Sequence, residues 1–225
     1  MNRTDPLLIT IDGPAGSGKT TLAKQLAQEL AIAYLDTGAM FRGIALYLGE
    51  NSWNLPLELL QEYLSSIKFQ LTRTGSDSRL LMNEAPLSED IRSEKVGIWA
   101  SHLGQNTMVR EYLKKLQQEI GNQTSLVTEG RDMGTVVFPH AKYKFYLDAS
   151  AEERAKRRWE QLRENAQNPD YNEILYQLRQ RDEQDMNRST APLKPAEDAI
   201  VIDTTHLDKK EVFSKMLQYV QLNKS

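Results

Sequence analysis

The chain has 225 residues, of which 40% are hydrophobic and 26% charged, and its formal net charge is −3 at pH 7. That share of apolar residues is enough for a packed interior, which excludes a disordered or low-complexity chain. The slightly acidic balance argues against nonspecific nucleic-acid binding, which needs a basic excess. The absence of cysteine excludes disulfides, thiolate zinc sites and a thiol nucleophile.

The hydropathy pattern predicts neither a membrane span nor a signal peptide. The longest unbroken apolar run, Leu30–Leu35, has six residues, whereas a membrane span needs about 20. The N-terminal apolar stretch is interrupted by Asp12 and Gly13, unlike the core of a signal peptide. Together with the lack of cysteine, these features favour a cytoplasmic protein with no membrane partner.

The first predicted elements alternate between strand and helix. Leu7–Ile11 is a short apolar, β-branched run, which predicts a buried strand. Leucines then recur at every fourth position, which predicts a helix, and Ile32–Leu35 is expected to be a second strand. Two further helices are expected, one containing Phe41, Ala45 and Leu48 and one over Leu55–Leu64.

The region that follows interrupts this alternation. Ile67–Thr72 and Leu80–Asn83 resemble short strands, and the composition of Arg73–Ser78 between them predicts a turn. We interpret residues 63–104 as an insertion that carries a small antiparallel element.

Alternation resumes in the second half of the chain. The expected strands are Leu126–Thr128, Tyr143–Leu147 and Ala199–Ile202, and the expected helices cover residues 109–120, 151–166, 173–188 and 212–220. Strand–helix repetition of this kind predicts an α/β fold with a parallel central sheet. The length favours one domain, residues 1–225, rather than two.

A glycine-rich motif connects the first strand to the first helix. Residues 13–20 read G-P-A-G-S-G-K-T and fit the pattern G-x-x-x-x-G-K-[ST]. In that setting backbone N–H groups and the helix N-terminus attract phosphate, Lys19 reaches the β- and γ-phosphates, and the Thr20 hydroxyl binds Mg²⁺. The alternative is a glycine turn that only caps a helix. We predict binding of a nucleoside triphosphate by Gly13, Pro14, Ala15, Gly16, Ser17, Gly18, Lys19, Thr20 and Thr21.

The motif alone leaves a GTPase, an ATPase motor and a small-molecule kinase as candidates. The sequence lacks the N/T-K-x-D motif that reads guanine in GTPases. Late arginines favour phosphoryl transfer to a second phosphate, since guanidinium groups bind phosphate oxygens in pairs. Residues 154–188 hold eight Lys or Arg, seven of them Arg, against seven Asp or Glu. The alternative interpretation is a solvated helix surface with ion pairs.

A phosphate acceptor also explains why no catalytic base is evident. The second pKa of a phosphate monoester is about 6, so the group is already nucleophilic at neutral pH. Phosphoryl transfer then depends mainly on positioning and electrostatic stabilisation. His102, His140 and His206 form no recognisable constellation, and we interpret them as structural or surface residues.

The sequence resembles the cytidylate kinase family of bacterial nucleoside monophosphate kinases. The resemblance rests on five ordered stretches that span nearly the whole chain: residues 11–21 (IDGPAGSGKTT), 35–42 (LDTGAMFR), 129–139 (EGRDMGTVVFP), 147–154 (LDASAEER) and 181–188 (RDEQDMNR). The phosphate-loop motif is common to many kinases, whereas the third and fifth stretches are much more specific.

The resemblance implies a fold and a reaction. The implied fold is a P-loop NTPase with three α/β/α layers, an extended nucleotide-binding arm at residues 63–104 and a helical lid at residues 151–188. The implied reaction transfers the γ-phosphate of ATP to CMP or dCMP with the aid of Mg²⁺. The partners would be these small molecules only, and the chain would act as a monomer.

The resemblance also implies roles for individual residues. Thr37, Arg110 and Asp132 would face the cytosine, with Arg188 nearby; Ser101 and Asp185 would hold the sugar, assisted by Arg181; Arg42 and Arg131 would grip the acceptor phosphate; and Arg154 and Arg158 would close over the donor phosphates. The catalytic set would be Lys19, Arg131, Arg154, Arg158 and Arg181.

Three positions carry specific expectations. Phe41 stands where the family usually has tyrosine, so a hydroxyl contact is lost while the ring can still pack. Asp132 suits cytosine because a carboxylate accepts from the N4 amino group, whereas uracil presents an acceptor there; alternatively, Asp132 pairs with Arg131 or caps a turn. Glu129 would either hold Mg²⁺ through water or orient Arg131.

Two other functions compete with CMP phosphorylation. One is a kinase for UMP, dTMP or a small hydroxyl substrate, and the other is a nucleotide-sensing module that binds ATP without turnover. Retention of Thr20 and of the full arginine set argues against the sensing module.

Overall fold

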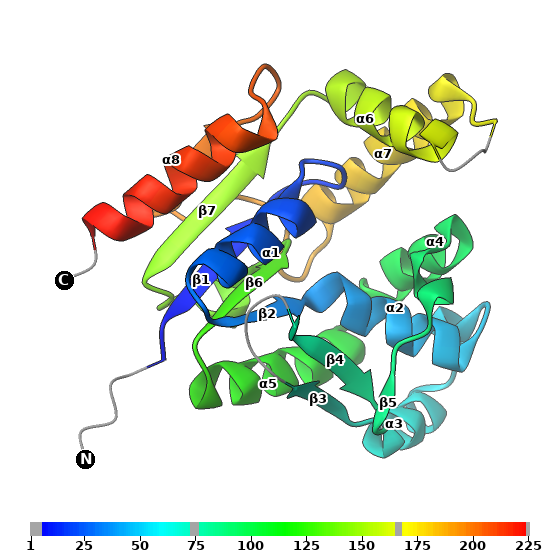
Figure 1. The fold of residues 1–225 in the computed structure, drawn as a ribbon. Coiled ribbons are helices and arrows are strands. Elements are labelled where there is room, and N and C mark those ends of the chain that lie inside the picture. The colour runs from blue at the N-terminus through cyan, green and yellow to red at the C-terminus, as the bar shows by residue number, and fades with distance from the viewer. Residues whose placement is uncertain (1–5, 73–76, 165–167, 224–225) are drawn as a thin grey trace, which may run out of the picture. The chain divides into compact units, whose positions relative to one another are not determined.

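The computed structural model describes residues 6–72, 77–164 and 168–223, which contain two sheets (Figure 1). The larger sheet has five strands in the order β2-β6-β1-β7-β8. Its strands are β1 (Leu8–Asp12), β2 (Ala33–Asp36), β6 (Leu126–Gly130), β7 (Tyr143–Asp148) and β8 (Ile200–Asp203). The pairs β1–β7, β2–β6 and β7–β8 are parallel, which confirms the predicted parallel α/β sheet.

Strand β1 occupies the centre of this sheet, between β6 and β7. Its register places Ile9 opposite Tyr143 and Ile11 opposite Phe145. Both isoleucines are fully buried on one face of the strand, and Thr10 is fully buried on the other. Burial on both faces explains why the strand reads as a continuous apolar run rather than an alternating one. In open parallel sheets, ligands bind beyond the carboxyl ends of the strands where the strand order reverses, and the glycine-rich motif follows β1 at that edge.

Four of the five parallel strands end on an aspartate. Asp12, Asp36, Asp148 and Asp203 are the last residues of β1, β2, β7 and β8. Each carboxylate accepts a backbone N–H from the segment that it faces; Asp36, for example, caps helix α2 through Ala39 N at 2.9 Å. The bonds of Asp36, Asp148 and Asp203 are local and favour a turn over the continued strand ladder. Asp12 differs, because it accepts from Met133 and Gly134, far along the chain.

The chain divides into two compact units, and each is described by itself. Unit 1 comprises residues 1–8 and 27–129, and unit 2 comprises residues 9–26 and 130–225. The finer division into a core, an arm at residues 63–104 and a lid at residues 151–188 stays a prediction. No described helix is long and apolar enough to cross a membrane.

Unit 1 combines helices with the second sheet. Its helices are α2 (Thr37–Leu48), α3 (Leu57–Ser66), α4 (Glu94–Leu103) and α5 (Thr107–Gln123), and its antiparallel sheet has β3 (Phe69–Thr72), β4 (Arg79–Met82) and β5 (Ala85–Pro86). Buried side chains such as Met40, Leu60 and Leu113 form its core. The antiparallel element predicted in the insertion is confirmed for β3 and β4, while the two-residue β5 was too short to predict.

Two helices of unit 1 differ from the sequence-based expectation. Helix α3 begins at Leu57 rather than Leu55, because Pro56 disfavours the helical backbone for the residue before it. Leu55 is extended, at ψ 143°, and Pro56 is the N-cap. Helix α4 was not predicted, although Ser93 caps it through Val96 N and Val96, Trp99 and Leu103 recur at helical spacing. Of the predicted turn Arg73–Ser78, residues 73–76 lie outside the described part of the chain.

Unit 2 carries the phosphate loop and three C-terminal helices. Helix α1 (Lys19–Glu29) follows the loop, α6 (Ala151–Glu164) and α7 (Tyr171–Asn187) pack against one another, and α8 (Lys209–Leu222) lies beside β7 (Figure 1). Ala155, Leu162 and Ile174 form a small core between α6 and α7. The predicted end of α6 at Ala166 falls outside the described residues.

Candidate nucleotide-binding site

The phosphate loop has three glycines at positive φ, Gly13, Gly16 and Gly18, and a Cβ on the first two would also crowd a neighbour. Gly13 has φ +146°, and a Cβ there would lie 2.0 Å from the carbonyl oxygen of Leu147, an impossible contact. Gly16 has φ +80°, and a Cβ there would lie 3.2 Å from the Cβ of Arg154. The loop is therefore folded tightly against β7 and α6, both of which belong to unit 2.

Lysine 19 is held against the same loop. Its Nζ donates to the carbonyl oxygen of Pro14 at 2.6 Å, and the hydroxyl of Ser17 donates to that oxygen at 3.0 Å. Lys19 is also the first residue of α1, so its ammonium group and the positive end of the helix lie at one place. This arrangement of cation, helix end and glycine-rich backbone is suited to binding a phosphate chain.

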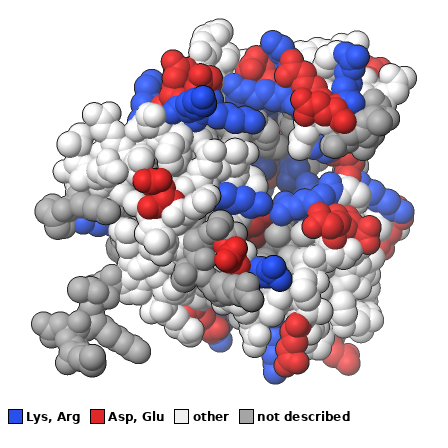
Figure 2. Space-filling view, viewed as in Figure 1, with Lys and Arg blue, Asp and Glu red and all other residues white. Residues whose placement is uncertain are grey.

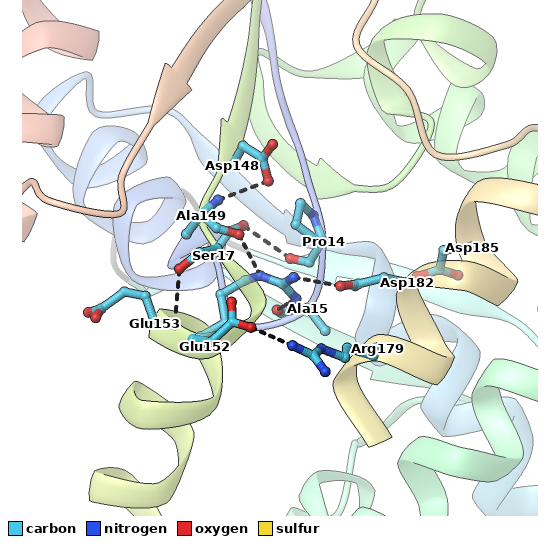
Figure 3. A network of polar contacts seen from close by, with 12 residues as sticks. Pro14, Ala15, Ser17, Asp148, Ala149, Glu152, Glu153, Arg179, Asp182 and Asp185 are labelled. Carbon is cyan, nitrogen blue, oxygen red and sulfur yellow. Dashed lines mark hydrogen bonds and ion pairs between the residues drawn. The ribbon is translucent and has the colours of Figure 1, made fainter. Parts of the chain in front are cut away.

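Arginine 154, on α6, binds both the phosphate loop and α7. Figure 3 labels its partners Ala15, Ala149 and Asp182. Its Nη1 donates to the carbonyl oxygen of Ala15 at 3.0 Å and its Nε to that of Ala149 at 2.9 Å. Its Nη2 forms an ion pair with Asp182 Oδ2 at 2.6 Å, and both side chains are largely buried. Arg154 is thus fixed beside the phosphate loop, where the sequence prediction places a donor-phosphate ligand.

Arg158, which is predicted to bind the donor phosphates together with Arg154, lies in a more exposed position. Arg158 Nη1 donates to Gln161 Oε1 at 2.8 Å along the surface of α6. Where α6 and α7 lie, Figure 2 shows positive and negative side chains next to one another. Ion pairs such as Arg157–Glu153 and Arg179–Glu152 occur there, so part of the arginine-rich segment is an ordinary solvated helix surface, as the alternative interpretation held.

Four side chains predicted to bind the acceptor nucleotide meet within unit 2. Arg131 Nε pairs with Asp185 Oδ2 at 2.8 Å. Arg188 Nη1 lies 3.5 Å from Asp185 Oδ1, and Arg188 Nη2 lies 3.6 Å from Asp132 Oδ1. Residues 54 positions apart in the sequence are therefore assembled into one cluster of alternating charge. We call Arg131, Asp132, Asp185 and Arg188 the acceptor cluster.

The acceptor cluster sets the ionisation of Asp185. Burial alone would raise the pKa of this carboxyl group, but the guanidinium groups of Arg131, Arg181 and Arg188 more than offset burial and hold its pKa below the usual range. Asp185 is therefore a permanent acceptor at neutral pH, which suits hydrogen bonding to a hydroxyl group. Arg181, one helical turn earlier on α7, belongs to the same electrostatic environment.

The surroundings of Asp132 bear on its two alternative roles. Its side chain makes no cap hydrogen bond to the π-helical turn Met133–Val137 that follows it in the described structure. Its carboxylate forms an ion pair with Arg188. The side chain is 7% exposed, so whatever it binds is recognised in a largely desolvated setting.

Unit 1 holds the other predicted substrate ligands. Arg42 on α2 donates through Nη1 to the carbonyl oxygens of Ile91 and Ser93, at 2.7 and 3.1 Å. Gly97 on α4 makes this approach possible, because a Cβ there would lie 2.8 Å from Arg42 Nη2. Ser101 lies one turn further along α4 and is partly buried.

Arginine 110 and Thr37 are also fixed within unit 1. Arg110 Nη1 donates to the carbonyl oxygen of Gly104 at 3.1 Å, and its guanidinium lies 5.8 Å from the centre of the Phe41 ring. The ring thus packs at this position, as expected from the sequence. Thr37 begins α2 and donates its hydroxyl hydrogen to the carbonyl oxygen of Glu129 at 2.6 Å.

Glutamate 129 bonds to Tyr34, a partner that the sequence analysis did not foresee. The Tyr34 hydroxyl donates to Glu129 Oε1 at 2.5 Å. Burial and the neighbouring Glu129 and Asp36 raise the pKa of Tyr34 far above its usual range, so this hydroxyl remains a donor. No group of three or more His, Cys, Asp or Glu side chains suited to a metal occurs in the described residues.

The structure thus assembles the predicted residues in two groups. The phosphate loop, Arg154, Arg181 and the acceptor cluster lie in unit 2, whereas Thr37, Arg42, Ser101 and Arg110 lie in unit 1. Sequence reasoning missed Asp12, which binds the backbone after Asp132, and Asp182, which binds Arg154. Asp12 lies in the stretch of residues 11–21 and Asp182 in that of residues 181–188, both of which carry the family resemblance. Their position next to predicted site residues could therefore have identified them.

Comparison with known proteins identifies the family. The sequence model of the family described as cytidylate kinase matches residues 9–222. A cytidylate kinase from Maridesulfovibrio salexigens is 54% identical over 212 residues, which cover 94% of this chain and 95% of the relative. A cytidylate kinase from Lawsonia intracellularis is 49% identical over 215 residues, with 96% of both chains covered.

Solved structures support the fold alone. A protein from Thermus thermophilus is similar with a TM-score of 0.52 and 18% identity, covering 99% of this chain and all of the other. An uncharacterised protein from Eubacterium ventriosum gives a TM-score of 0.50 at 15% identity, with 96% of this chain and 98% of the other covered.

Proposed function

Because the chain belongs to the cytidylate kinase family, we propose that it transfers the γ-phosphate of ATP to CMP or dCMP, giving ADP and CDP or dCDP. The observation that carries this proposal is the acceptor cluster, in which two arginines and two aspartates are drawn together from the β6–β7 connection and the end of α7. Such a cluster offers bidentate cations for phosphate together with carboxylate acceptors for amino and hydroxyl groups.

The phosphate loop is the proposed donor site. Backbone N–H groups of residues 13–18 would bind the β-phosphate, and Lys19 and Arg154 would stabilise the negative charge that develops on the transferred group. Arg158 and Arg181 are proposed to join them, with Arg158 exchanging its bond to Gln161 for a donor phosphate oxygen. Thr21 completes the loop at the start of α1.

A magnesium ion is proposed to accompany ATP. Thr20 stands in the first turn of α1, and Mg²⁺ typically takes one or two protein oxygens, several waters and phosphate oxygens. When bound, Mg²⁺ would neutralise charge on the β- and γ-phosphates.

The reaction needs no protein base in this proposal. An oxygen of the CMP phosphate attacks the γ-phosphorus, the bond to the β–γ bridging oxygen breaks, and ADP leaves. Arg42 and Arg131 would hold the attacking phosphate in line with the γ-phosphate. Arg131 has five N–H donors, of which Nε binds Asp185 and Nη1 contacts the carbonyl oxygen of Gly130; in this proposal other N–H groups of the guanidinium turn to the phosphate.

Base and sugar recognition are assigned to polar groups fixed by the fold. Asp132 would accept a hydrogen bond from the cytosine N4 amino group, with Arg110, Thr37 and Arg188 around the ring. Asp185, which remains ionised, would accept from a sugar hydroxyl with Ser101 and Arg181 beside it. Uracil would place its O4 acceptor against the buried Asp132 carboxylate, and two acceptors cannot form a hydrogen bond with one another.

A direct test compares CMP, dCMP, UMP, dTMP and AMP as acceptors with saturating ATP and Mg²⁺ in an assay that couples ADP formation to NADH oxidation. CMP and dCMP should exceed the others in kcat/KM by at least about ten-fold, given the cost of a mispaired buried group. A preference for UMP, dTMP or a hydroxyl compound would replace the proposed function with the competing kinase. Binding of ATP without ADP formation would instead indicate the sensing module.

The variant Asp132→Asn sharpens this test. Asparagine keeps the size of aspartate but offers both a donor and an acceptor, so the preference for CMP over UMP should fall by about ten-fold or more. Glu160→Gln, an exposed acid-to-amide change on α6, is the matched control and should leave the preference unchanged. A monomeric, cytoplasmic enzyme is expected, and sedimentation with and without CMP checks the first of these properties.

A further inference from the structure

The buried carboxylate of Asp12 connects the start of the phosphate loop with the segment that carries the acceptor cluster. Asp12 is the last residue of β1, and its side chain is almost completely buried. Oδ1 accepts the backbone N–H of Met133 at 2.9 Å, and Oδ2 accepts that of Gly134 at 2.8 Å. Both oxygens of one carboxylate are thus used on two consecutive residues that lie 121 and 122 positions away.

These two residues follow Asp132 directly, and the carbonyl group of Asp132 is held as well. Its carbonyl oxygen accepts the N–H groups of Val136 and Val137, at 2.9 and 3.1 Å. The next two N–H groups in the chain are the ones bound by Asp12. With its carbonyl and the following amides fixed, Asp132 has little freedom to rotate its backbone, which has φ −145° and ψ 21°.

The segment around Gly134 packs so closely on β1 that a side chain at this position would crowd the strand. A Cβ on Gly134 would lie 3.0 Å from Thr10 Oγ1 and 3.4 Å from Asp12 Oδ2. Gly134 therefore admits the two hydrogen bonds, and a larger residue would push the segment away from the carboxylate. Burying a carboxylate costs free energy of folding unless the group is hydrogen-bonded. The two amide bonds to Asp12 offset this cost only when donors and acceptors are aligned, so the contact fixes the geometry of the segment.

We propose that Asp12 is a positioning residue for the acceptor nucleotide: it fixes the backbone of residues 132–134 and thereby sets where Asp132 and Arg131 present their side chains. The inference rests on the proposed function and adds to it a residue that touches neither nucleotide. Asp12 would act on acceptor binding and on base selection, while the phosphate loop itself would still bind ATP through Lys19 and its own N–H groups.

The experiment replaces the carboxylate by an amide, Asp12→Asn, which turns one of the two acceptors into a donor facing a backbone N–H. The expected result is a rise of about ten-fold in KM for CMP and in the calorimetric Kd for CMP, with the CMP-over-UMP preference reduced at least about five-fold. KM for ATP should stay within about two-fold. A purely structural role would instead lower the unfolding temperature and affect both substrates alike.

Asp203→Asn is the matched control, since Asp203 also ends a parallel strand and accepts a backbone N–H, that of Thr205, at 2.8 Å. It should leave both KM values unchanged. If Asp12→Asn does not fold, Gly134→Ala perturbs the same contact from the other side and should give the same selective rise in KM for CMP.

The outcomes separate this inference from the proposed function. Unchanged CMP binding in Asp12→Asn, or an equal weakening of ATP and CMP, would overturn the positioning role while CMP phosphorylation by the unaltered chain still stands. Failure of the unaltered chain and of Asp203→Asn to phosphorylate CMP would overturn the proposed function and this inference with it.

Discussion

Arg154 Nη2 lies 2.6 Å from Asp182 Oδ2, and this ion pair joins α6 to α7 directly beside the phosphate loop. Arg154 is 5% and Asp182 14% exposed, so the pair is largely shielded from water. Burial raises the pKa of Asp182, and the hydrogen bond from Arg154 acts in the opposite direction. The relationship explains why an arginine predicted to bind donor phosphates has a defined position.

The variant Asp182→Asn should misplace Arg154 without removing it. We expect kcat to fall about ten-fold and the free energy of unfolding to fall by about 2 kcal/mol, while KM for CMP stays within about two-fold. Steady-state kinetics and urea denaturation check these values. Glu183→Gln, the exposed neighbour on α7, is the control; a kcat for Asp182→Asn equal to that of this control would contradict the prediction.

The depressed pKa of Asp185 predicts a pH-dependent contribution to stability. A carboxyl group whose pKa is lower in the folded chain stabilises the fold above its unfolded pKa of about 3.9, and this contribution is lost as the pH falls through the folded value. Asp185→Asn should therefore cost about 3 kcal/mol at pH 7 and progressively less below pH 4. Denaturation at several pH values tests this, and a cost independent of pH would be inconsistent with it.

Asp12 should show the opposite dependence. Burial raises the pKa of Asp12 to about 6, and the negative charge of Asp132 adds to this rise. The hydrogen bonds from the Gly134 and Met133 amides and the charge of Lys19 act in the opposite direction. Tyr146 lies near the same carboxylate. A raised pKa means that the folded chain binds the extra proton, so stability falls as the pH rises from about 4 to about 6.

Relative to Asp12→Asn, the unaltered chain should therefore lose about 2–3 kcal/mol of unfolding free energy between pH 4 and pH 7. Paired denaturation curves at those two pH values measure the difference. A constant difference between the two proteins would show that Asp12 does not titrate in this range.

Gly97→Ala tests the packing that fixes Arg42. Alanine stabilises a helix interior by about 1 kcal/mol relative to glycine, so the chain should remain folded. The new Cβ would displace the Arg42 guanidinium, because it would lie 2.8 Å from Nη2. KM for CMP should rise about ten-fold at unchanged KM for ATP, whereas Ile98→Ala, an exposed change on the same helix, should leave both unaltered.

Substitution of Phe41, also in unit 1, should weaken CMP binding less than displacement of Arg42 does. Its ring lies 5.8 Å from the Arg110 guanidinium, a contact of about 0.5–1 kcal/mol. Phe41→Leu should raise KM for CMP by about two- to five-fold, whereas Phe41→Tyr keeps the ring and should behave as the unaltered chain does. Identical kinetics for the leucine and tyrosine variants would exclude a role for the ring.

The sequence analysis was most successful where the controlling interactions are local. The strand, glycine-rich turn and helix of residues 8–29 were predicted because apolar periodicity and glycine content act over a few residues. Helix α4 was missed because its spacing was read as part of an insertion, and the start of α3 was misplaced by two residues because Pro56 forces an extended backbone. The roles assigned to individual site residues remain predictions.

By itself, the sequence determined the fold class, the phosphate loop and the family resemblance, since each depends on contiguous residues and their spacing. Only the tertiary structure decided which polar groups pair. Asp12 accepts hydrogen bonds from the amides of Met133 and Gly134, and ion pairs join Arg154 to Asp182 and Arg131 to Asp185. The physical reason is that these partners lie 28 to 122 positions apart, so the sheet and the packing of α6 on α7 must form before any of these pairs exists.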